Sequence, residues 1–312
     1  CRILKKLTPP LLLTLTLTLP LSVESRFINS ARASKPVPTG VRYRDFPAKF
    51  GRNLRLRSLG RPRDIGSLRP HAFPSEYNDV VRRASGAALK MLQNDIQLIE
   101  IEFPVVSLSA VSGDGEGAGE MTLSAKYTQQ IVQLLSRQNQ KIRVFFPDEQ
   151  EAKYQKKRFK GMVNIRIDFL TRPTIFGDLG LDPFKLEMRE RIRDDDELFV
   201  IAYPSFNPNE MIAVRELYDQ DTQNRPIIII NGELDRIRSG YYPSFFYPRL
   251  NKAMEEFLPC FDQALYLHNF KGSRGGALLR EYPGEFQVYT RDSLGLKVQQ
   301  VYSQQDMPTL KE

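Results

Sequence analysis

The spacing of hydrophobic and polar residues predicts alternating helices and strands over most of the chain. Apolar side chains that recur every three or four positions predict a helix over 77–91. Over 96–103, apolar residues alternate with Glu100 and Glu102, which predicts a strand with one buried and one exposed face. The Gly-, Ser- and Glu-rich stretch 107–120 predicts a flexible surface loop.

The alternation continues toward the C-terminus. Strands are predicted over 142–146, 163–169, 198–202, 227–230 and 264–270, and helices over 123–135, 149–160, 208–218 and 244–258. The four isoleucines at 227–230 fit a strand covered on both faces, as at the centre of a parallel sheet. Pro248 lies early in the last helix and can start it.

The final part of the chain changes to strand-like segments joined by short turns. These segments are 277–281, 285–290 and 296–303, and they predict an antiparallel finish. We see no internal repeat and no boundary inside 71–312. The sequence therefore predicts one α/β domain, with a mixed, mostly parallel Rossmann-like sheet, flanking helices and an antiparallel C-terminal part.

Charge is distributed unevenly between the N-terminal segment and this domain. The formal net charge of the chain is +8. Residues 1–70 hold 15 basic and 3 acidic side chains, which leaves 30 basic and 34 acidic side chains for the remainder. The basic balance thus belongs to the N-terminal segment, and the predicted domain is slightly acidic. A nucleic-acid partner, which the overall charge alone would suggest, is not expected.

The N-terminal segment has the composition of two targeting signals in series. Lys5 and Lys6 precede a Leu/Thr-rich stretch, so residues 1–25 resemble a signal peptide. Residues 26–70 are rich in Arg and poor in acid, like a transit peptide, and we expect them to be disordered. Because the chain begins at Cys1 and not at Met, we expect its natural start upstream. Such a bipartite leader predicts a plastid location; the alternative is a disordered basic arm on a secreted protein.

Composition also limits the chemistry that the domain can carry. No apolar run reaches the ~18 residues of a membrane-spanning helix. Two histidines and two distant cysteines, Cys1 and Cys260, exclude a zinc cluster and a disulfide framework, and Cys260 is expected to be a small buried residue. No nucleotide-binding glycine motif or nucleophile elbow is present. We therefore predict no catalytic residue, no metal and no cofactor.

Three polar loops follow predicted strands, where ligands of open α/β sheets bind. The first, 203–210, contains Asn207, which either caps a helix or helps to bind an anion at its N-terminus. The second, 231–240, contributes the candidates Asn231, Glu233, Asp235, Arg236 and Arg238. Its carboxylates suit acid–base work or Mg²⁺ and its arginines suit phosphate, whereas the alternative is a surface salt-bridge network.

The third loop, 271–276, contains Lys271 and Arg274 between glycines. It is either a phosphate cradle or, since the Walker spacing is missing, a basic hairpin turn. A group of aromatic residues follows the second loop and comprises Tyr241, Tyr242, Phe245, Phe246 and Tyr247. The group either anchors its loop in the core or forms a surface for a partner.

Several of these stretches resemble one known family. They are AYPSFNPNEM (202–211), IIIINGELDRIRSGYYPSFFYPRL (227–250), LHNFKGSRGGALLREYPGEFQVY (267–289) and QDMPTLKE (305–312), with IEIEFP (99–104) and VFFPDEQEA (144–152) upstream. Together they resemble the plastid and cyanobacterial family known as domain of unknown function 1995, over roughly residues 73–312. The family includes a chloroplast photosystem II assembly factor of the LOW PSII ACCUMULATION type, and its domain is attached to some plastid adenylate kinases.

The resemblance implies a plastid protein of the stroma, with peripheral thylakoid association, but no catalytic residues. We therefore expect a non-enzymatic factor that assists photosystem II assembly, with photosystem II core subunits and assembly factors as partners. The alternative is an enzyme that binds a nucleotide or phosphometabolite, or an accessory domain of a plastid kinase. Geometry discriminates between them: convergence of the loop charges on one pocket favours a ligand, and dispersal beside exposed aromatics favours a partner.

Overall fold

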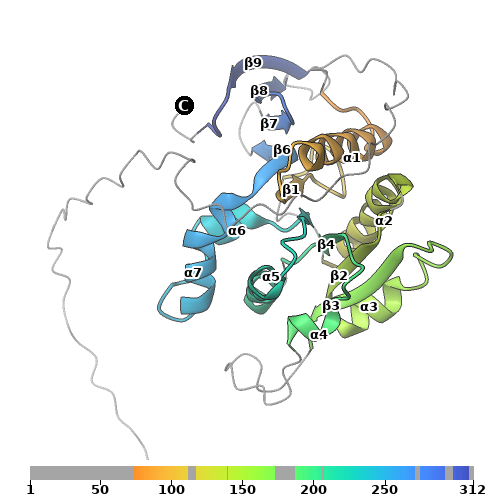
Figure 1. The fold of residues 1–312 in the computed structure, drawn as a ribbon. Coiled ribbons are helices and arrows are strands. Elements are labelled where there is room, and N and C mark those ends of the chain that lie inside the picture. The colour runs from red at the N-terminus through yellow and green to blue at the C-terminus, as the bar shows by residue number, and fades with distance from the viewer. Residues whose placement is uncertain are drawn as a thin grey trace, which may run out of the picture. The chain divides into compact units, whose positions relative to one another are not determined.

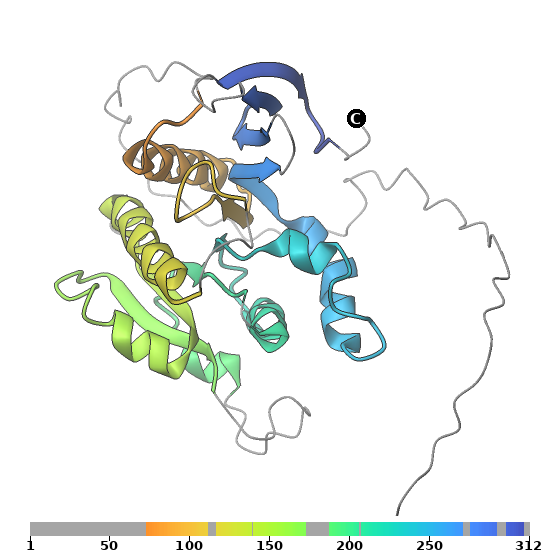
Figure 2. The ribbon, with the colours of Figure 1, turned by 180° about the vertical axis from the view of Figure 1, so that it is seen from behind.

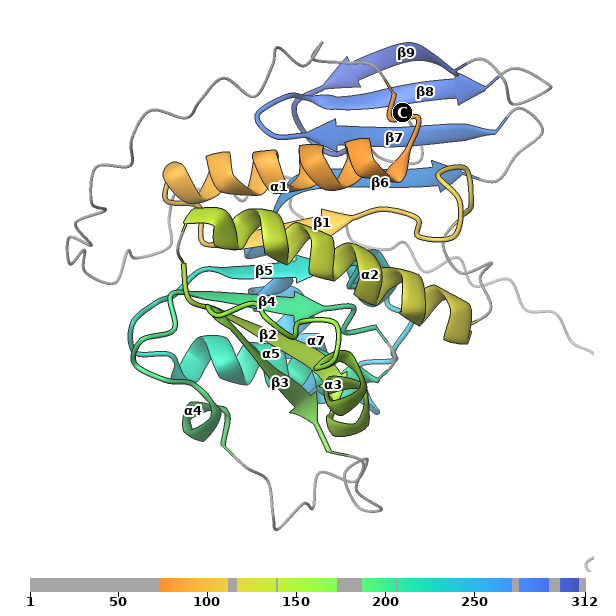
Figure 3. The same ribbon diagram turned by 90° about the vertical axis from the view of Figure 1, so that its right-hand side faces the viewer.

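The fold is built on one mixed β-sheet, whose strands lie side by side in Figure 3 from β9 at the top to β3 at the bottom. The computed structural model describes residues 73–111, 117–138, 140–172, 187–205, 207–270, 275–291 and 298–308. The strands in these residues are β1 (Leu98–Glu102), β2 (Ile142–Asp148), β3 (Ile165–Thr171), β4 (Leu198–Ala202), β5 (Ile227–Ile230), β6 (Asp262–Phe270), β7 (Gly276–Glu281), β8 (Phe286–Arg291) and β9 (Val298–Gln304). The described residues all belong to one compact unit, Leu68–Glu312, and residues 1–72, which include the predicted targeting signals, lie outside them.

The strand order is β3-β2-β4-β5-β1-β6-β7-β8-β9. Neighbours from β3 to β6 pair in parallel, and β6 to β9 pair antiparallel. The predicted α/β class, with a mostly parallel sheet and an antiparallel C-terminal part, is confirmed. The parallel pairing brings the carboxyl ends of β1, β4 and β5 to one edge of the sheet.

Helices cover both faces of the parallel part (Figures 1 and 2). One face carries α1 (Tyr77–Gln93), α2 (Gly117–Leu135) and α3 (Glu149–Gln155), and the other carries α4 (Met188–Arg191), α5 (Pro208–Gln220), α6 (Leu234–Arg238) and α7 (Pro248–Glu256). Two short 3₁₀ turns, Ser136–Gln138 and Leu258–Cys260, follow α2 and α7. Each face has its own apolar core, as expected for an α/β sheet.

The isoleucine strand β5 lies at the centre of the parallel part, as its sequence predicts. Ile228 and Ile230 pack into the core beneath α1 and α2, whereas Ile227 and Ile229 pack beneath α5 and α7. All four side chains are buried. A strand with helices on both faces has no solvent-facing side, and this explains the absence of alternation at these positions.

Several sequence predictions were wrong. All of β1 is buried, including Glu100 and Glu102, so its second face does not meet solvent. The predicted loop 107–120 is shortened because α2 already begins at Gly117. Part of the predicted loop 231–240 forms the short helix α6. Cys260 is exposed and not buried.

Candidate functional site

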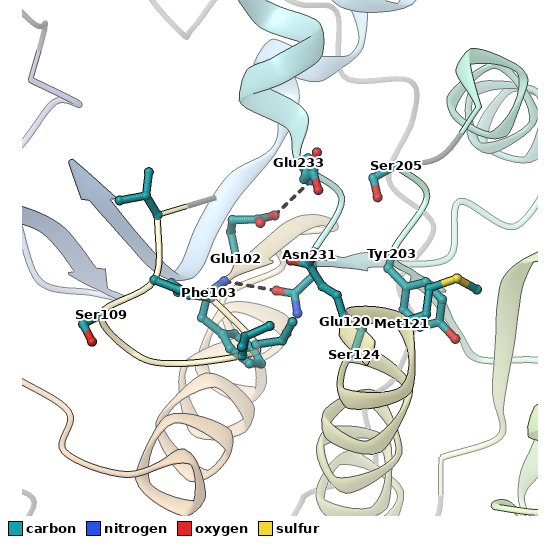
Figure 4. Close-up of a pocket in the computed structure, with 15 residues that line it drawn as sticks. Glu102, Phe103, Ser109, Glu120, Met121, Ser124, Tyr203, Ser205, Asn231 and Glu233 are labelled. Atoms are coloured by element: carbon teal, nitrogen blue, oxygen red, sulfur yellow. Dashed lines mark hydrogen bonds between the residues drawn. The ribbon is translucent and has the colours of Figure 1, made fainter. Parts of the chain in front are cut away.

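A cavity of about 310 Å³ lies at the carboxyl ends of β1, β4 and β5, beside the first turns of α2 (Figure 4). Its polar lining includes Glu102 at the end of β1, Glu120 and Ser124 on α2, and Asn231 and Glu233 after β5. We call it the strand-end cavity. Open α/β sheets bind ligands at this edge. The cavity is therefore the leading candidate for a binding site.

Three residues that line the strand-end cavity have a left-handed backbone. Their φ angles are +36° for Tyr203, +51° for Asn231 and +46° for Glu233. Residues other than glycine adopt this region rarely, and such conformations cluster at functional sites. Here they turn the chain immediately after the strands: Tyr203 N donates to Ile230 O at 2.7 Å and Asn231 N donates to Ile101 O at 2.8 Å. The cavity wall is thus held in place by ladder-like backbone hydrogen bonds.

Side-chain hydrogen bonds join the loops after β1 and β5 at the floor of the cavity. Phe103 N donates to Asn231 Oδ1 at 3.0 Å, and Glu233 N donates to Glu102 Oε2 at 3.1 Å. Burial raises the pKa of Glu102 well above 4.5, and the nearby charges of Glu100, Glu233 and Asp235 raise it further. A carboxyl group with a raised pKa keeps its proton to a higher pH than an exposed one and, while protonated, can itself donate a hydrogen bond.

Glu233 lines the same cavity and is paired with Arg236, which lies outside the lining. Arg236 Nη1 lies 2.9 Å from Glu233 Oε2, and Arg236 also donates to the carbonyl oxygen of Ser205. Burial raises the pKa of Glu233; Arg236 opposes the shift, and the charge of Glu120 adds to it. Glu120 and Glu233 therefore face a common space and repel each other when both are ionised.

Asp235 and Arg238 do not line the cavity and instead belong to a buried network around Glu100. Arg238 donates through both terminal nitrogens to Glu100, at 2.9 and 3.2 Å, and to Asp235 Oδ1 at 3.0 Å. Tyr266 donates its hydroxyl to Asp235, and Gln263 Nε2 donates to Glu100 at 3.0 Å. These side chains satisfy each other, so the loop charges do not converge on one pocket. The salt-bridge interpretation of this loop holds for them.

The remaining candidates separate in the same way. Asn207 caps α5, because its side-chain oxygen accepts from Asn209 N at 2.8 Å. It does not line the strand-end cavity, and capping accounts for it. Lys271 and Arg274 lie outside the described residues, although the strands on either side of them, β6 and β7, are antiparallel neighbours.

Comparison with protein families identifies the family of this domain. A family model described as a domain of unknown function, DUF1995, matches residues 74–312. The chain belongs to the DUF1995 family. The resemblance carried by the sequence motifs is thereby confirmed over nearly the same residues. No curated protein and no solved structure matches the chain.

The aromatic group of this DUF1995 domain is largely exposed and occupies residues 241–247, which we call the aromatic segment. The exposed fraction is 68% for Tyr241, 88% for Phe245, 73% for Phe246 and 39% for Tyr247. Tyr242 alone of the five packs against the core beneath α5 and α7. The interpretation that the group anchors its loop in the core is therefore wrong for most of its members.

Metal centres and membrane spans are two other kinds of site to consider for the DUF1995 domain. Within the described ranges, His, Cys, Asp and Glu side chains form no group of three or more that could hold a metal ion. None of the helices in this part of the chain combines the length and apolar character needed to cross a bilayer.

Sequence reasoning missed Glu102, Glu120 and Ser124 as cavity residues, whereas Tyr203 begins the first candidate loop, 203–210. The position of Glu102 at the end of a strand, directly before Phe103 and Pro104, was a usable signal because strand ends of parallel sheets meet. Glu120 and Ser124 gave none, since a charged and a polar side chain in a helix are ordinary surface residues.

Proposed function

We propose that this DUF1995 chain is a plastid factor that binds photosystem II polypeptides during assembly, and that the aromatic segment is its docking surface. The observation that carries the proposal is the exposure of Phe245 and Phe246. Burying one such side chain gains about 1.5–3 kcal/mol, so two neighbouring ones in water favour a partner. Aromatic residues are also enriched in the buried centres of protein interfaces.

The state of the neighbouring charges supports binding over catalysis. Arg238 pairs with Glu100, and Arg236 pairs with Glu233. Asp235 accepts a hydrogen bond from the hydroxyl group of Tyr266. An enzyme that grips phosphate needs arginines that point into an open pocket. The guanidinium carbon of Arg236 instead lies 5.7 Å from the ring centre of Tyr241. Arg236 therefore extends the surface of the aromatic segment.

Family membership and the N-terminal segment support the identity of the partner and the place. The motifs resemble those of a chloroplast photosystem II assembly factor, and the leader has the composition of a plastid-directed signal. Unassembled membrane subunits expose apolar surface, which matches two exposed phenylalanines. Stromal delivery with peripheral thylakoid contact is consistent with this partner. Imaging of the tagged full chain in an algal host tests delivery: secretion or mitochondrial fluorescence would contradict it.

The docking proposal is tested with the double variant Phe245→Ser/Phe246→Ser of the full chain. Tagged wild type and variant are expressed in the algal host, purified after mild solubilisation and compared by quantitative mass spectrometry. Wild type is expected to capture photosystem II core subunits or assembly factors, and the variant is expected to lose at least about nine-tenths of them, the tenfold loss that corresponds to ~1.4 kcal/mol.

The matched control is Tyr154→Ser/Val163→Ser, which removes two exposed apolar side chains elsewhere, with exposed fractions of 62% and 95%. The control is expected to capture the same partners as wild type. Absence of photosystem II proteins from the wild-type sample would refute the assigned partner. Equal capture by both double variants would refute the assigned surface.

A further inference from the structure

Asn231 presents a hydrogen-bond donor that the fold does not use. Its side chain is 6% exposed and lines the strand-end cavity. The amide oxygen accepts from Phe103 N, whereas Nδ2 has no hydrogen-bond partner among the described residues (Figure 4). Leaving a buried donor unpaired costs about 1–3 kcal/mol. An acceptor atom brought by a ligand would recover this energy.

The charge of the lining points to the other half of such a ligand. Glu120 and Glu233 face the cavity, and neither lysine nor arginine occurs among its described lining residues. Arg236 pairs with Glu233 from outside the lining and compensates one of the two carboxylates. Glu120 has no such partner among the lining residues, and its charge adds to that of Glu233. A small cation in the cavity would relieve the repulsion between the two.

The rest of the lining combines apolar residues with Glu102 and three serines, Ser109, Ser124 and Ser205. Phe103, Val105, Met121 and the ring of Tyr203 form its walls, and the exposed residue Val106 contributes to the lining as well. A volume of about 310 Å³ is at the low end for small-molecule sites. The cavity therefore fits a short apolar side chain together with one or two polar groups.

We propose that the strand-end cavity binds a primary ammonium group with a carbonyl group on the neighbouring carbon and a short apolar side chain. The ammonium group donates to the carboxylates of Glu120 and Glu233, and the carbonyl oxygen accepts from Asn231 Nδ2. Amino-acid amides and polypeptide N-termini share this chemistry. A free amino acid does not fit, because its own carboxylate would be repelled by the glutamates. The site is independent of the aromatic segment, so either proposal can fail alone.

Isothermal titration calorimetry of the full chain tests the ligand chemistry. Leucinamide is the probe, and leucine and N-acetyl-leucinamide are its controls, since one adds a carboxylate and the other lacks the ammonium group. Leucinamide is expected to bind at least ~10-fold more tightly than either control. A peptide amide that begins with leucine separates the two sources. Tighter binding than leucinamide identifies a polypeptide N-terminus, and weaker or equal binding identifies a free amide.

Two variants assign the binding to the named side chains. Glu120→Gln removes a charge from a half-exposed position on α2, and Asn231→Asp keeps the oxygen that Phe103 N needs while replacing the unpaired donor. Each is expected to weaken leucinamide binding at least ~5-fold. The matched control is Glu76→Gln, an exposed glutamate before α1, which is expected to bind as wild type.

Three results would overturn the site: no binding of leucinamide, equal binding of a control compound, or an unchanged dissociation constant in Glu120→Gln. The last result is decisive even if Asn231→Asp fails to fold, because Glu120 makes no hydrogen bond or ion pair with the described residues at the strand ends.

Discussion

Replacing Arg238 by methionine removes the guanidinium group that faces the buried carboxylate of Glu100. The side chain of Glu100 is 1% exposed and that of Arg238 is 26% exposed. Breaking a buried ion pair by removing one partner costs about 3–5 kcal/mol. We expect about 3 kcal/mol here, because Arg238 is partly solvated and Gln263 still donates to Glu100. Urea unfolding followed by circular dichroism measures the loss, since the chain has no tryptophan.

The reverse change, Glu100→Gln, is expected to cost only about 1 kcal/mol. Arg238 retains its contact with Asp235 at 3.0 Å and part of its solvent. In the double variant neither charge of this pair remains, so its stability should lie near that of Glu100→Gln, with a coupling energy of about 3 kcal/mol. Additive losses in the double variant would refute the buried-pair explanation.

The cost of Arg238→Met also depends on pH. Burial raises the pKa of Glu100 above its ordinary value of 4.5 even though Arg238 opposes the shift, and loss of Arg238 raises it further. The folded state then binds a proton on Glu100 more tightly than the unfolded state does. The stability that this proton contributes is therefore present below pH 4.5 and is lost as the pH rises through the folded-state pKa of Glu100. The destabilisation should therefore shrink toward pH 4.5; a constant cost across pH would contradict this.

Three further changes test other parts of the structure. The raised pKa of Glu102 makes the wild type lose stability as the pH rises above 4.5. Glu102→Gln should therefore gain stability relative to the wild type over this range, by ~1.4 kcal/mol for each unit by which the folded-state pKa of Glu102 exceeds 4.5. Urea unfolding at a series of pH values measures the difference. Asn207→Ala should destabilise the domain by about 1 kcal/mol through loss of the α5 cap, seen as a lower Tm. Phe245→Ser should change unfolding free energy by less than ~0.5 kcal/mol, whereas Phe257→Ala in the core, where the side chain is 1% exposed, should cost about 3–5 kcal/mol.

Elements with strong local signals could be predicted from the sequence. The four isoleucines of β5 required cover on both faces, and the Asn207-Pro208 pair fixed the start of α5. The short turns after β7 predicted the antiparallel finish. In each case the residues that decide the structure are neighbours in the chain, so pattern and propensity were sufficient.

Glu100 and Glu102 could not be placed in this way. Alternation shows that they share one face of β1, but it does not show whether that face meets solvent. They lie on the face of Leu98, which packs into the core beneath α5 and α7. The loop and helix that follow β5 cover them: Arg238 on α6 pairs with Glu100, and Glu233 N donates to Glu102.

The short helix α6 explains why the charges of 231–240 could not be interpreted beforehand. Five residues are too few to show a helical period, and the partner of Arg238 is 138 positions away in the chain. Once α6 covers β1, the polar residues of this loop fall into two groups. Arg238 pairs with the buried Glu100 and with Asp235, whereas the side chains of Asn231 and Glu233 line the strand-end cavity. The side-chain amide nitrogen of Asn231 has no hydrogen-bond partner among the described residues. An unpaired buried donor, which folding itself does not require, is the property expected of a binding site.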